Sequence, residues 1–394
     1  MSAVKPTAKG VPLRIGFIPL TDAASLIVAV DKGFTAEEGL DVSLIREVSW
    51  SNVRDKLNLG LFEAAHLLAP VAIASTLGVG HIKVPIVAPL NLSLNGNAIT
   101  VSPKLYQAIV AEADGDPLDP LVSAQALARI VAARRKSGQD ALTFGMTFPF
   151  STHNYQLRFW MAAGGIDPDE DVRLVVLPPP YMVDSLASGQ VDGFCVGAPW
   201  NSIAVDLGVG RILLFSTDIL TRGAEKVLAV RQSWADRHDD TLMALLRALH
   251  RGAAFIDAAG NHPDVAALLA RPDRLGVDAE VVMRTLTGRL KVAHDGTVRG
   301  HDHYLLVSRN GAARPDPVQA AWLYAQMVRW RQAPLSAAGL QAATGVYRPD
   351  LFDRAIPDYA AATAQPSDGV GAFAGPTFDP RNIEAYLRAL PILR

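Results

Sequence analysis

Short apolar stretches alternate with amphipathic helical stretches along roughly the first 230 residues of the chain. Residues 13–18 and 40–45 have the pattern of strands, and each is followed by a stretch with helical spacing, at residues 23–34 and 51–59. After about residue 235 the pattern becomes helical, with helices expected at residues 241–259, 263–269, 278–290 and 317–331. The alternation predicts an α/β fold built on largely parallel sheets and followed by a helical region.

An internal repeat runs through the α/β part at one constant offset of 129 residues. Its motif is Asp-x-Leu-x-x-Gly followed by a short apolar strand and Ala-Pro, at residues 55–70 and again at residues 184–199. Leu13 and Gly16 in the opening strand match Leu142 and Gly145 at the same offset. Seven matches in a single register predict two lobes of similar βαβ plan, with a boundary near residue 100.

Each lobe has a turn between its first strand and the following helix, at residues 19–22 and 149–153. Open α/β sheets bind ligands outside the carboxyl ends of their strands. Helix N-termini at that edge present free N–H groups and the positive end of the helix dipole, which suits an anion. Two such lobes that face each other predict a hinged site that closes around its ligand.

Composition and charge narrow the class of protein. Of 394 residues, 49% are hydrophobic, which excludes a disordered chain. The net charge of −2, from 37 basic and 39 acidic residues, gives no electrostatic basis for direct nucleic-acid binding. The single cysteine, Cys195, excludes an internal disulfide and a multi-cysteine metal site.

The first ten residues are short, polar and interrupted by Pro6. They lack the basic start and apolar run of a secretory signal. Elsewhere no stretch approaches the roughly 18 consecutive apolar residues of a membrane helix. We therefore expect a cytoplasmic protein that does not contact a membrane.

Several motifs resemble the family of nitrate- and bicarbonate-binding proteins represented by NrtA and CmpA. They extend from about residue 13 to the C-terminus, at residues 16–24, 48–50, 95–99, 146–149, 152–154, 196–201, 225–227 and 347–353. The resemblance implies an α/β, two-lobed periplasmic-binding-protein type II fold with helical C-terminal additions. Most members are exported receptors of ABC transporters. Without an export signal, the chain resembles the cytoplasmic NasS branch of nitrate/nitrite sensors, whose protein partner is the ANTAR-domain antiterminator NasT.

The expected organisation follows from the repeat and the resemblance together. Residues 1–12 are expected to be a disordered N-terminus, and residues 13–100 the first part of lobe 1. Residues 101–227 are expected to form lobe 2. Residues 228–394 are expected to return to lobe 1 and add the helical C-terminal region.

The resemblance also implies a nitrate-binding set, made of Trp50, Asn97, His153, Gly197 and Lys226. Lys226 would supply the counter-charge, and the other four would supply hydrogen-bond donors. Asn97 stands where the nitrate-binding relatives have glutamine, so the amide is kept on a side chain one methylene shorter. The bicarbonate binder carries an acidic residue at the position of Lys226 and uses calcium, so Lys226 argues against bicarbonate and a metal. No cofactor and no catalytic residue are expected.

Taken singly, these residues have simpler interpretations. His153 would more often cap a helix, Lys226 would be a solvated surface lysine, and Trp50 could be a core residue. Their positions within the family motifs favour the binding site instead.

The predicted function is nitrate or nitrite sensing. The ligand would change the geometry of the lobes, and the resemblance implies that ligand-bound protein releases NasT to permit expression of nitrate-assimilation genes. Three alternatives stay open: a receptor of an ABC transporter for the same ligand, a relative that binds bicarbonate, sulfonate or a thiamine precursor, and an enzyme on this fold. No Ser-His-Asp arrangement, Walker loop or paired-carboxylate signature in the sequence supports the enzyme.

Overall fold

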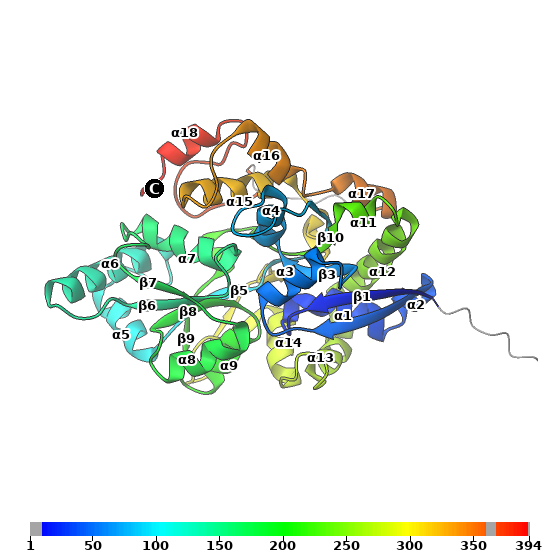
Figure 1. Ribbon diagram of the computed structural model, residues 1–394. Coiled ribbons are helices and arrows are strands. Elements are labelled where there is room, and N and C mark those ends of the chain that lie inside the picture. The colour runs from blue at the N-terminus through cyan, green and yellow to red at the C-terminus, as the bar shows by residue number, and fades with distance from the viewer. Residues whose placement is uncertain (1–9, 360–367, 393–394) are drawn as a thin grey trace, which may run out of the picture.

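Two α/β lobes lie side by side in the computed structural model, which describes residues 10–359 and 368–392, and a helical layer extends across one end of both (Figure 1). Residues 1–9 of the expected disordered N-terminus lie outside the described residues, and Val11 already belongs to the first strand. Within the described ranges, no helix has the length and apolarity needed to cross a membrane.

Lobe 1 is built on a six-stranded sheet in the order β13-β4-β10-β3-β1-β2. β1 pairs in parallel with β2 and β3, whereas β10 is antiparallel to both β3 and β4. The strands are β1 (Val11–Phe17), β2 (Leu40–Arg46), β3 (Ala64–Leu68), β4 (Ile86–Asn95), β10 (Ala224–Arg231) and β13 (Leu305–Leu306).

Lobe 2 has a five-stranded sheet in the order β7-β6-β8-β5-β9. β6 is parallel to β7 and β8, and β5 is antiparallel to β8 and β9. The order β7-β6-β8-β5 thus repeats β2-β1-β3-β10, as the 129-residue repeat predicted. The strands are β5 (Asn97–Val101), β6 (Thr143–Met146), β7 (Arg173–Val176), β8 (Gly193–Gly197) and β9 (Arg211–Phe215).

Both sheets are mixed, and the prediction of largely parallel sheets is wrong in this respect. β5 follows β4 after the single residue Gly96, and β10 follows β9 after the short helix α10; in both cases the chain enters from the other lobe and the strand runs antiparallel to its neighbours in the new sheet.

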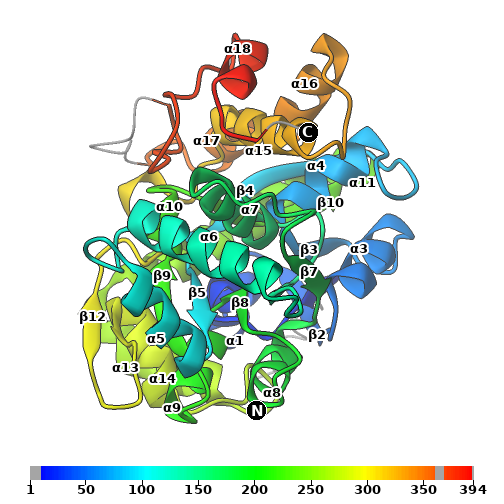
Figure 2. The same ribbon diagram turned by 90° about the vertical axis from the view of Figure 1, so that its left-hand side faces the viewer.

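Helices cover the faces of both sheets (Figure 2). Those of lobe 1 are η1 (Thr21–Ala23), α1 (Ala24–Asp31), α2 (Phe34–Glu37), α3 (Trp50–Asn58), α4 (Ala69–Leu77), α11 (Gln232–Ala235), α12 (Asp239–Asp257), η3 (Ala259–Asn261), α13 (His262–Ala270) and α14 (Ala279–Thr287). Those of lobe 2 are α5 (Pro103–Glu112), α6 (Pro120–Lys136), α7 (Thr152–Ala163), η2 (Pro179–Tyr181), α8 (Met182–Ala187), α9 (Trp200–Asp206) and α10 (Ser216–Ile219).

The rest of the chain forms a small sheet and the helical layer, from β11 (Arg289–Lys291), β12 (Val298–Gly300), η4 (Arg309–Gly311), α15 (Pro317–Arg329), α16 (Ala337–Thr344), α17 (Pro349–Ala355) and α18 (Ile383–Arg388). The four helices predicted after residue 235 are confirmed as α12, α13, α14 and α15.

The side chain of Asn95 forms hydrogen bonds between the two segments in which the chain crosses from one lobe to the other. The first crossing is at Asn95 and Gly96, which both have positive φ, 62° and 89°. The Asn95 Nδ2 donates to the carbonyl of Thr221 at 3.0 Å, and its Oδ1 accepts from the N–H of Gly223 at 2.8 Å, so its side chain spans to the second crossing. The predicted segment boundaries, at residues 100 and 227, fall inside β5 and β10.

The helical layer contacts both lobes. α15 and α16 pack on α4 of lobe 1. On the lobe 2 side, the Tyr155 hydroxyl of α7 donates to Gln332 Oε1 at 2.6 Å, and the Phe159 ring lies 6.1 Å from the Trp322 ring of α15. Helix α7 therefore touches the C-terminal layer along one face.

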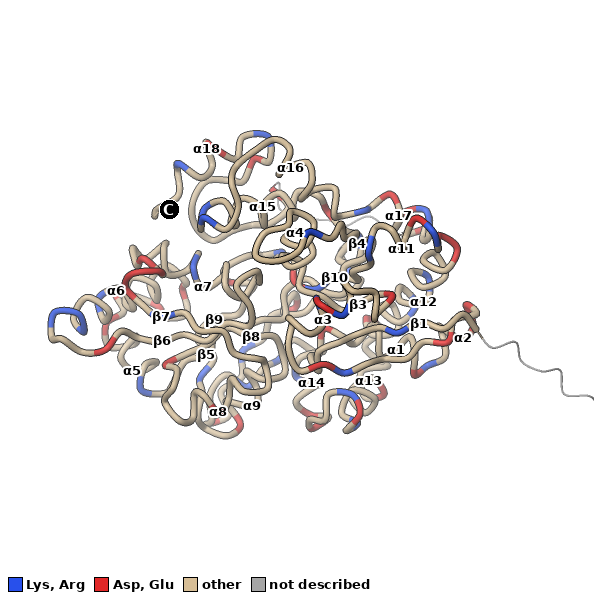
Figure 3. The backbone as a smooth tube through the Cα atoms, viewed as in Figure 1, with Lys and Arg blue, Asp and Glu red and all other residues tan. Residues whose placement is uncertain are grey.

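Charged residues of both signs are scattered over both lobes and the helical layer (Figure 3). This distribution agrees with the near-zero net charge.

Candidate functional site

A group of polar side chains is enclosed where the two lobes meet, and we refer to it as the interlobe cluster. Lobe 1 contributes η1, α3, β3 and β10, while lobe 2 contributes β5, β8, α7 and the turn that precedes α7. All members are buried: Asp22, Trp50, His66, Asn97, Thr147, His153, Gln156, Glu225 and Lys226. A buried polar cluster is costly unless its groups are bonded to one another or to a ligand.

Trp50 and His153 are positioned by the N-termini of two helices. The Ser49 hydroxyl accepts from the N–H of Asn52 and begins α3 with Trp50, while the Ser151 hydroxyl accepts from the N–H of Asn154 at the start of α7. His153 thus lies in the first turn of α7. Gln156 follows three residues later, on the same face of the helix.

Lys226 lies at the centre of the cluster. Its Nζ is 2.9 Å from Asp22 Oδ2, 2.7 Å from Glu225 Oε1 and 5.3 Å from the centre of the Trp50 ring. Burial acts to lower the pKa of Lys226, but the two carboxylates outweigh it and raise the pKa above the ordinary value. Lys226 is therefore a buried cation.

Asp22 is the fixed counter-ion of that cation. Its Oδ1 lies 2.9 Å from His66 Nε2, and the N–H of Ile18 donates to His66 Nδ1 at 3.4 Å. Burial acts to raise the pKa of Asp22, but Lys226 and His66 together hold it well below its usual range. Burial also lowers the pKa of His66, so this histidine is neutral with its proton on Nε2, facing Asp22.

Glu225 connects the two lobes. Besides Lys226, its Oε1 faces His153 Nδ1 at 3.4 Å, and its Oε2 accepts from Asn97 Nδ2 at 2.6 Å. Burial raises the pKa of this carboxyl, and the nearby Lys226 ammonium opposes the rise without cancelling it.

Four N–H donors of the cluster make no hydrogen bond within the described part of the chain: Trp50 Nε1, His66 Nε2, His153 Nε2 and Gln156 Nε2. Of these, His66 Nε2 still lies 2.9 Å from the Asp22 carboxylate, whereas the other three face no described counter-group. Burial and then Lys226 lower the pKa of His153 well below its ordinary value, so the ring is neutral. Thr147 Oγ1 lies 3.0 Å from His153 Nδ1, and a hydroxyl proton donated there leaves the ring proton on Nε2. Gln156 is oriented by Asn97 Nδ2 and the Cys195 thiol, which both donate to its Oε1, at 3.3 and 3.6 Å.

The structure brings four of the five sequence-predicted residues into this cluster and places the fifth, Gly197, at its border. A Cβ atom on Gly197 would lie 3.4 Å from both Asn97 Oδ1 and Asp22 Oδ2, so the backbone of β8 borders the same group. The amide group of Asn97 donates hydrogen bonds to Glu225 and Gln156. The role of the five in ligand binding stays a prediction.

Sequence reasoning did not assign Asp22, His66, Gln156 or Glu225 to the site. Signals for them existed: Asp22 ends the first strand-to-helix turn, and Glu225 precedes Lys226. Gln156 is one helical turn beyond His153, and His66 is a histidine inside the apolar strand β3. Across residues 10–359 and 368–392, no group of three or more His, Cys, Asp or Glu side chains is arranged to hold a metal ion.

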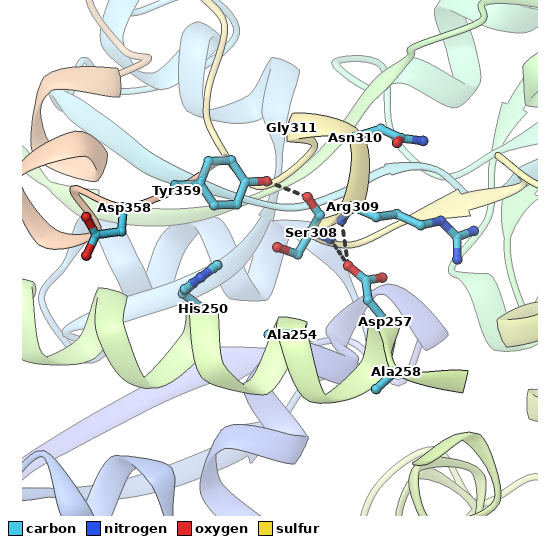
Figure 4. A pocket seen from close by; sticks show the side chains of 10 residues that line it. All are labelled: His250, Ala254, Asp257, Ala258, Ser308, Arg309, Asn310, Gly311, Asp358 and Tyr359. Carbon is cyan, nitrogen blue, oxygen red and sulfur yellow. Dashed lines mark hydrogen bonds between the residues drawn. The ribbon is translucent and has the colours of Figure 1, made fainter. Parts of the chain in front are cut away.

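A separate pocket of about 580 Å³ lies between α12, η4 and Tyr359 (Figure 4). Its Asp257 carboxylate already accepts from the N–H groups of Ser308 and Arg309, at 3.0 and 2.5 Å, and its Tyr359 hydroxyl donates to the Ser308 carbonyl. It contains none of the residues that the sequence predicts for the binding site.

Two lobes joined by crossing strands, with a buried polar cluster at their junction, define a periplasmic-binding-protein-like α/β protein. The comparison with protein families agrees, because the model of the NMT1-like family matches residues 7–270. The chain belongs to this family.

Relatives extend the similarity to the whole chain. The nitrate/nitrite binding protein NrtA of Nostoc sp. is 31% identical over 401 residues, which cover 99% of this chain and 88% of NrtA. The nitrate import ATP-binding protein NrtC of Synechocystis sp. and the bicarbonate transport ATP-binding protein CmpC of Synechococcus elongatus are each 33% identical over 389 residues, 97% and 98% of this chain. The chain spans about 55% of the length of these two ATP-binding relatives.

Among solved structures, the periplasmic nitrate-binding protein NrtA from Synechocystis PCC 6803 superposes with a TM-score of 0.86 at 28% identity, over 97% of this chain and 99% of that protein. The predicted two-lobed fold is confirmed.

Proposed function

We propose that the chain binds nitrate, and also nitrite, in the interlobe cluster, with Trp50, Asn97, His153, Gly197 and Lys226 among the residues of the site. The observation that carries this proposal is the set of unpartnered buried donors, Trp50 Nε1, His153 Nε2 and Gln156 Nε2, in the same cluster as the buried Lys226 ammonium. An unpartnered buried donor costs about 1–3 kcal/mol. An inorganic oxyanion accepts hydrogen bonds through every oxygen, so it can satisfy several donors at once.

The division of the site between the lobes supports ligand-driven closure. Trp50 and Lys226 belong to elements of lobe 1, whereas His153 and Gln156 belong to α7 of lobe 2. A ligand that contacts both sets has more partners in the closed arrangement than in an open one. Because a ligand shifts conformation only through such differential affinity, nitrate would stabilise the closed form.

The test is calorimetric titration of nitrate into the wild type and the variant Trp50→Phe, which keeps an aromatic ring near Lys226 but removes the indole N–H. We expect the variant to bind about tenfold or more weakly, because a hydrogen bond to a charged ligand contributes about 1.5–3 kcal/mol. Trp330→Phe is the matched control, since the Trp330 Nε1 is also buried without a described partner but lies at the end of α15.

Equal affinity in Trp50→Phe and wild type would remove Trp50 from the site. A panel of nitrate, nitrite, bicarbonate and an alkanesulfonate, followed by thermal unfolding, identifies the ligand, because a ligand of the folded state raises its stability by RT ln(1 + [L]/Kd). Stabilisation by bicarbonate or the sulfonate without stabilisation by nitrate would contradict the proposed ligand.

The output we propose is that of a cytoplasmic sensor of the NasS kind. Without nitrate the protein would hold the ANTAR-domain RNA-binding antiterminator NasT, and closure on nitrate would release it. We expect a one-to-one complex of the two proteins to dissociate when nitrate is added, as measured by size-exclusion chromatography with light scattering. A complex that persists at saturating nitrate would rule out this output.

A second candidate is the substrate-binding component of a nitrate ABC transporter. The similarity to NrtA over nearly the whole chain and to part of the import protein NrtC supports it equally. The two candidates differ in partner. A sensor releases the ANTAR protein on binding nitrate, whereas a receptor stimulates ATP hydrolysis by its transporter in proteoliposomes.

A further inference from the structure

The interlobe cluster carries a net negative charge before any ligand is present. The carboxylates of Asp22 and Glu225 oppose the single ammonium of Lys226, and His66 and His153 are neutral, so the net charge is −1. Both carboxylates lie within 3 Å of the ammonium nitrogen, at 2.9 and 2.7 Å. A nitrate ion would bring the net charge to −2, in a site where each of these side chains is at most 4% exposed. An uncompensated buried charge is highly unfavourable, so anion binding here requires a further positive charge.

A proton is the available compensation, and the surroundings of Glu225 favour that carboxyl as its acceptor. The charged and titratable groups around Glu225 are Lys226 on β10, Asp22 on η1, His153 on α7, His66 on β3, Cys195 on β8 and Tyr347 before α17. Asp22 is held ionised by Lys226 and His66, and burial keeps both histidines neutral and the Cys195 thiol and Tyr347 hydroxyl protonated. Glu225 is therefore the group whose protonation is favoured when a nitrate ion adds its negative charge to the cluster.

The contacts of Glu225 point to the same conclusion. Its carboxylate engages two of the predicted ligand-binding residues, at Lys226 Nζ (2.7 Å) and Asn97 Nδ2 (2.6 Å), and lies 3.4 Å from the unprotonated Nδ1 of a third, His153. An anion that binds Lys226 therefore competes directly with the Glu225 carboxylate. Protonation ends this competition, because the neutral acid gains an O–H donor and loses its attraction for the ammonium.

We propose that Glu225 takes up one proton from solvent when the anion binds, so that the protein binds nitrate and a proton together and the neutral Glu225 carboxyl helps to select an anion. This inference rests on the proposed function. It adds that Glu225 determines specificity, since a protonated carboxyl offers its hydrogen to an acceptor such as nitrate. Affinity should fall as pH rises, by up to about tenfold per pH unit, between the pKa of Glu225 in the free protein and its higher pKa in the complex.

The experiment is calorimetric titration of nitrate in phosphate and in Tris buffer, at several pH values between about 6 and 9. The two buffers differ in heat of ionisation, so the difference in observed heat counts the protons taken up. We expect uptake to approach one proton per nitrate at the alkaline end. The variant Glu225→Gln, which is neutral at every pH, should bind nitrate at least as tightly, without proton uptake and with little dependence on pH.

Asp218→Asn is the matched control. Asp218 is another acid whose pKa is raised by burial, although its side chain is only partly buried, and it pairs with Arg299 outside the interlobe cluster. This variant should keep the proton uptake of the wild type.

The outcomes separate this inference from the function on which it rests. Nitrate binding without proton uptake at any of these pH values would overturn the inference and leave nitrate binding intact. Undiminished uptake in Glu225→Gln would also overturn it, by assigning the proton to another group. A wild type that binds no nitrate would overturn both proposals. Thermal unfolding shows whether Glu225→Gln folds. If it does not, the proton uptake measured for the wild type still tests the inference.

Discussion

Lys226 shows how a lysine remains charged away from water. An ammonium has three N–H donors, and Asp22 and Glu225 accept two of them. The Trp50 ring lies on another side, at 5.3 Å, where its negative face adds a favourable cation–π contact. The two carboxylates therefore leave one N–H of Lys226 without an ion-pair partner, in a cluster where Trp50 Nε1 and Gln156 Nε2 also make no described hydrogen bond.

If the proposed site is correct, Gln156 supplies the amide that Asn97 is too short to offer. The Asn97 amide is occupied by Glu225 and Gln156, whereas the Nε2 of Gln156 is buried without a described partner. The Asn97 side chain thus orients a second amide, which we propose contacts the ligand.

We expect Gln156→Leu to bind nitrate about tenfold or more weakly, because it removes one hydrogen bond to a charged ligand at nearly constant volume. Calorimetric titration measures the change. Gln326→Leu, in an equally buried glutamine of α15, should leave the affinity unchanged. Wild-type affinity in Gln156→Leu would show that this amide does not contact the anion.

At the scale of elements, β1 and β6, the equivalent strands of the two lobes, each have a glycine where another side chain packs against the sheet. A Cβ atom on Gly16 of β1 would lie 2.2 Å from Phe62, and one on Gly145 of β6 would lie 3.0 Å from Met182. These equivalent positions in the repeat are therefore glycine for reasons of packing.

Gly16→Ala should lower the free energy of unfolding by about 1–3 kcal/mol, as overpacking of a core does. Urea unfolding measures the effect, and the added change Phe62→Leu should restore part of the loss. Gly260→Ala in η3, where a Cβ atom meets nothing within 4 Å, is the control and should change stability by less than about 0.5 kcal/mol. Full stability in Gly16→Ala would contradict the packing argument.

The elements that the sequence predicts best are those with a strong period or a repeated motif. The helices α12 to α15 follow from apolar spacing alone, and the two-lobe plan follows from matches such as Gly16 with Gly145. The direction of the strands could not be predicted from the sequence, because the apolar pattern of β10 is the same whether the strand runs parallel or antiparallel to its neighbours. Local pattern also gave no reason to place His66 next to Asp22, since the contact joins β3 to η1 across 44 positions of the chain.

At the scale of the whole molecule, α7 links the interlobe cluster to the C-terminal layer. His153 and Gln156 face the interlobe cluster, while Tyr155 and Phe159 of the same helix contact Gln332 and Trp322. A movement of α7 on ligand binding would therefore change its packing on α15. The layer is thus a physical route by which lobe closure could reach a partner.

The position of β10 in the first sheet has a consequence for biosynthesis. β10 lies between β3 and β4, yet all of lobe 2 separates it from them along the chain. Lobe 2 is complete when α10 has emerged from the ribosome, apart from contacts with later segments. β3 and β4, which are synthesised earlier, remain unpaired on the sides where β10 will lie. We therefore expect the second lobe to mature before the first during translation, with two apolar strand edges exposed in the interval, where chaperones would be expected to bind.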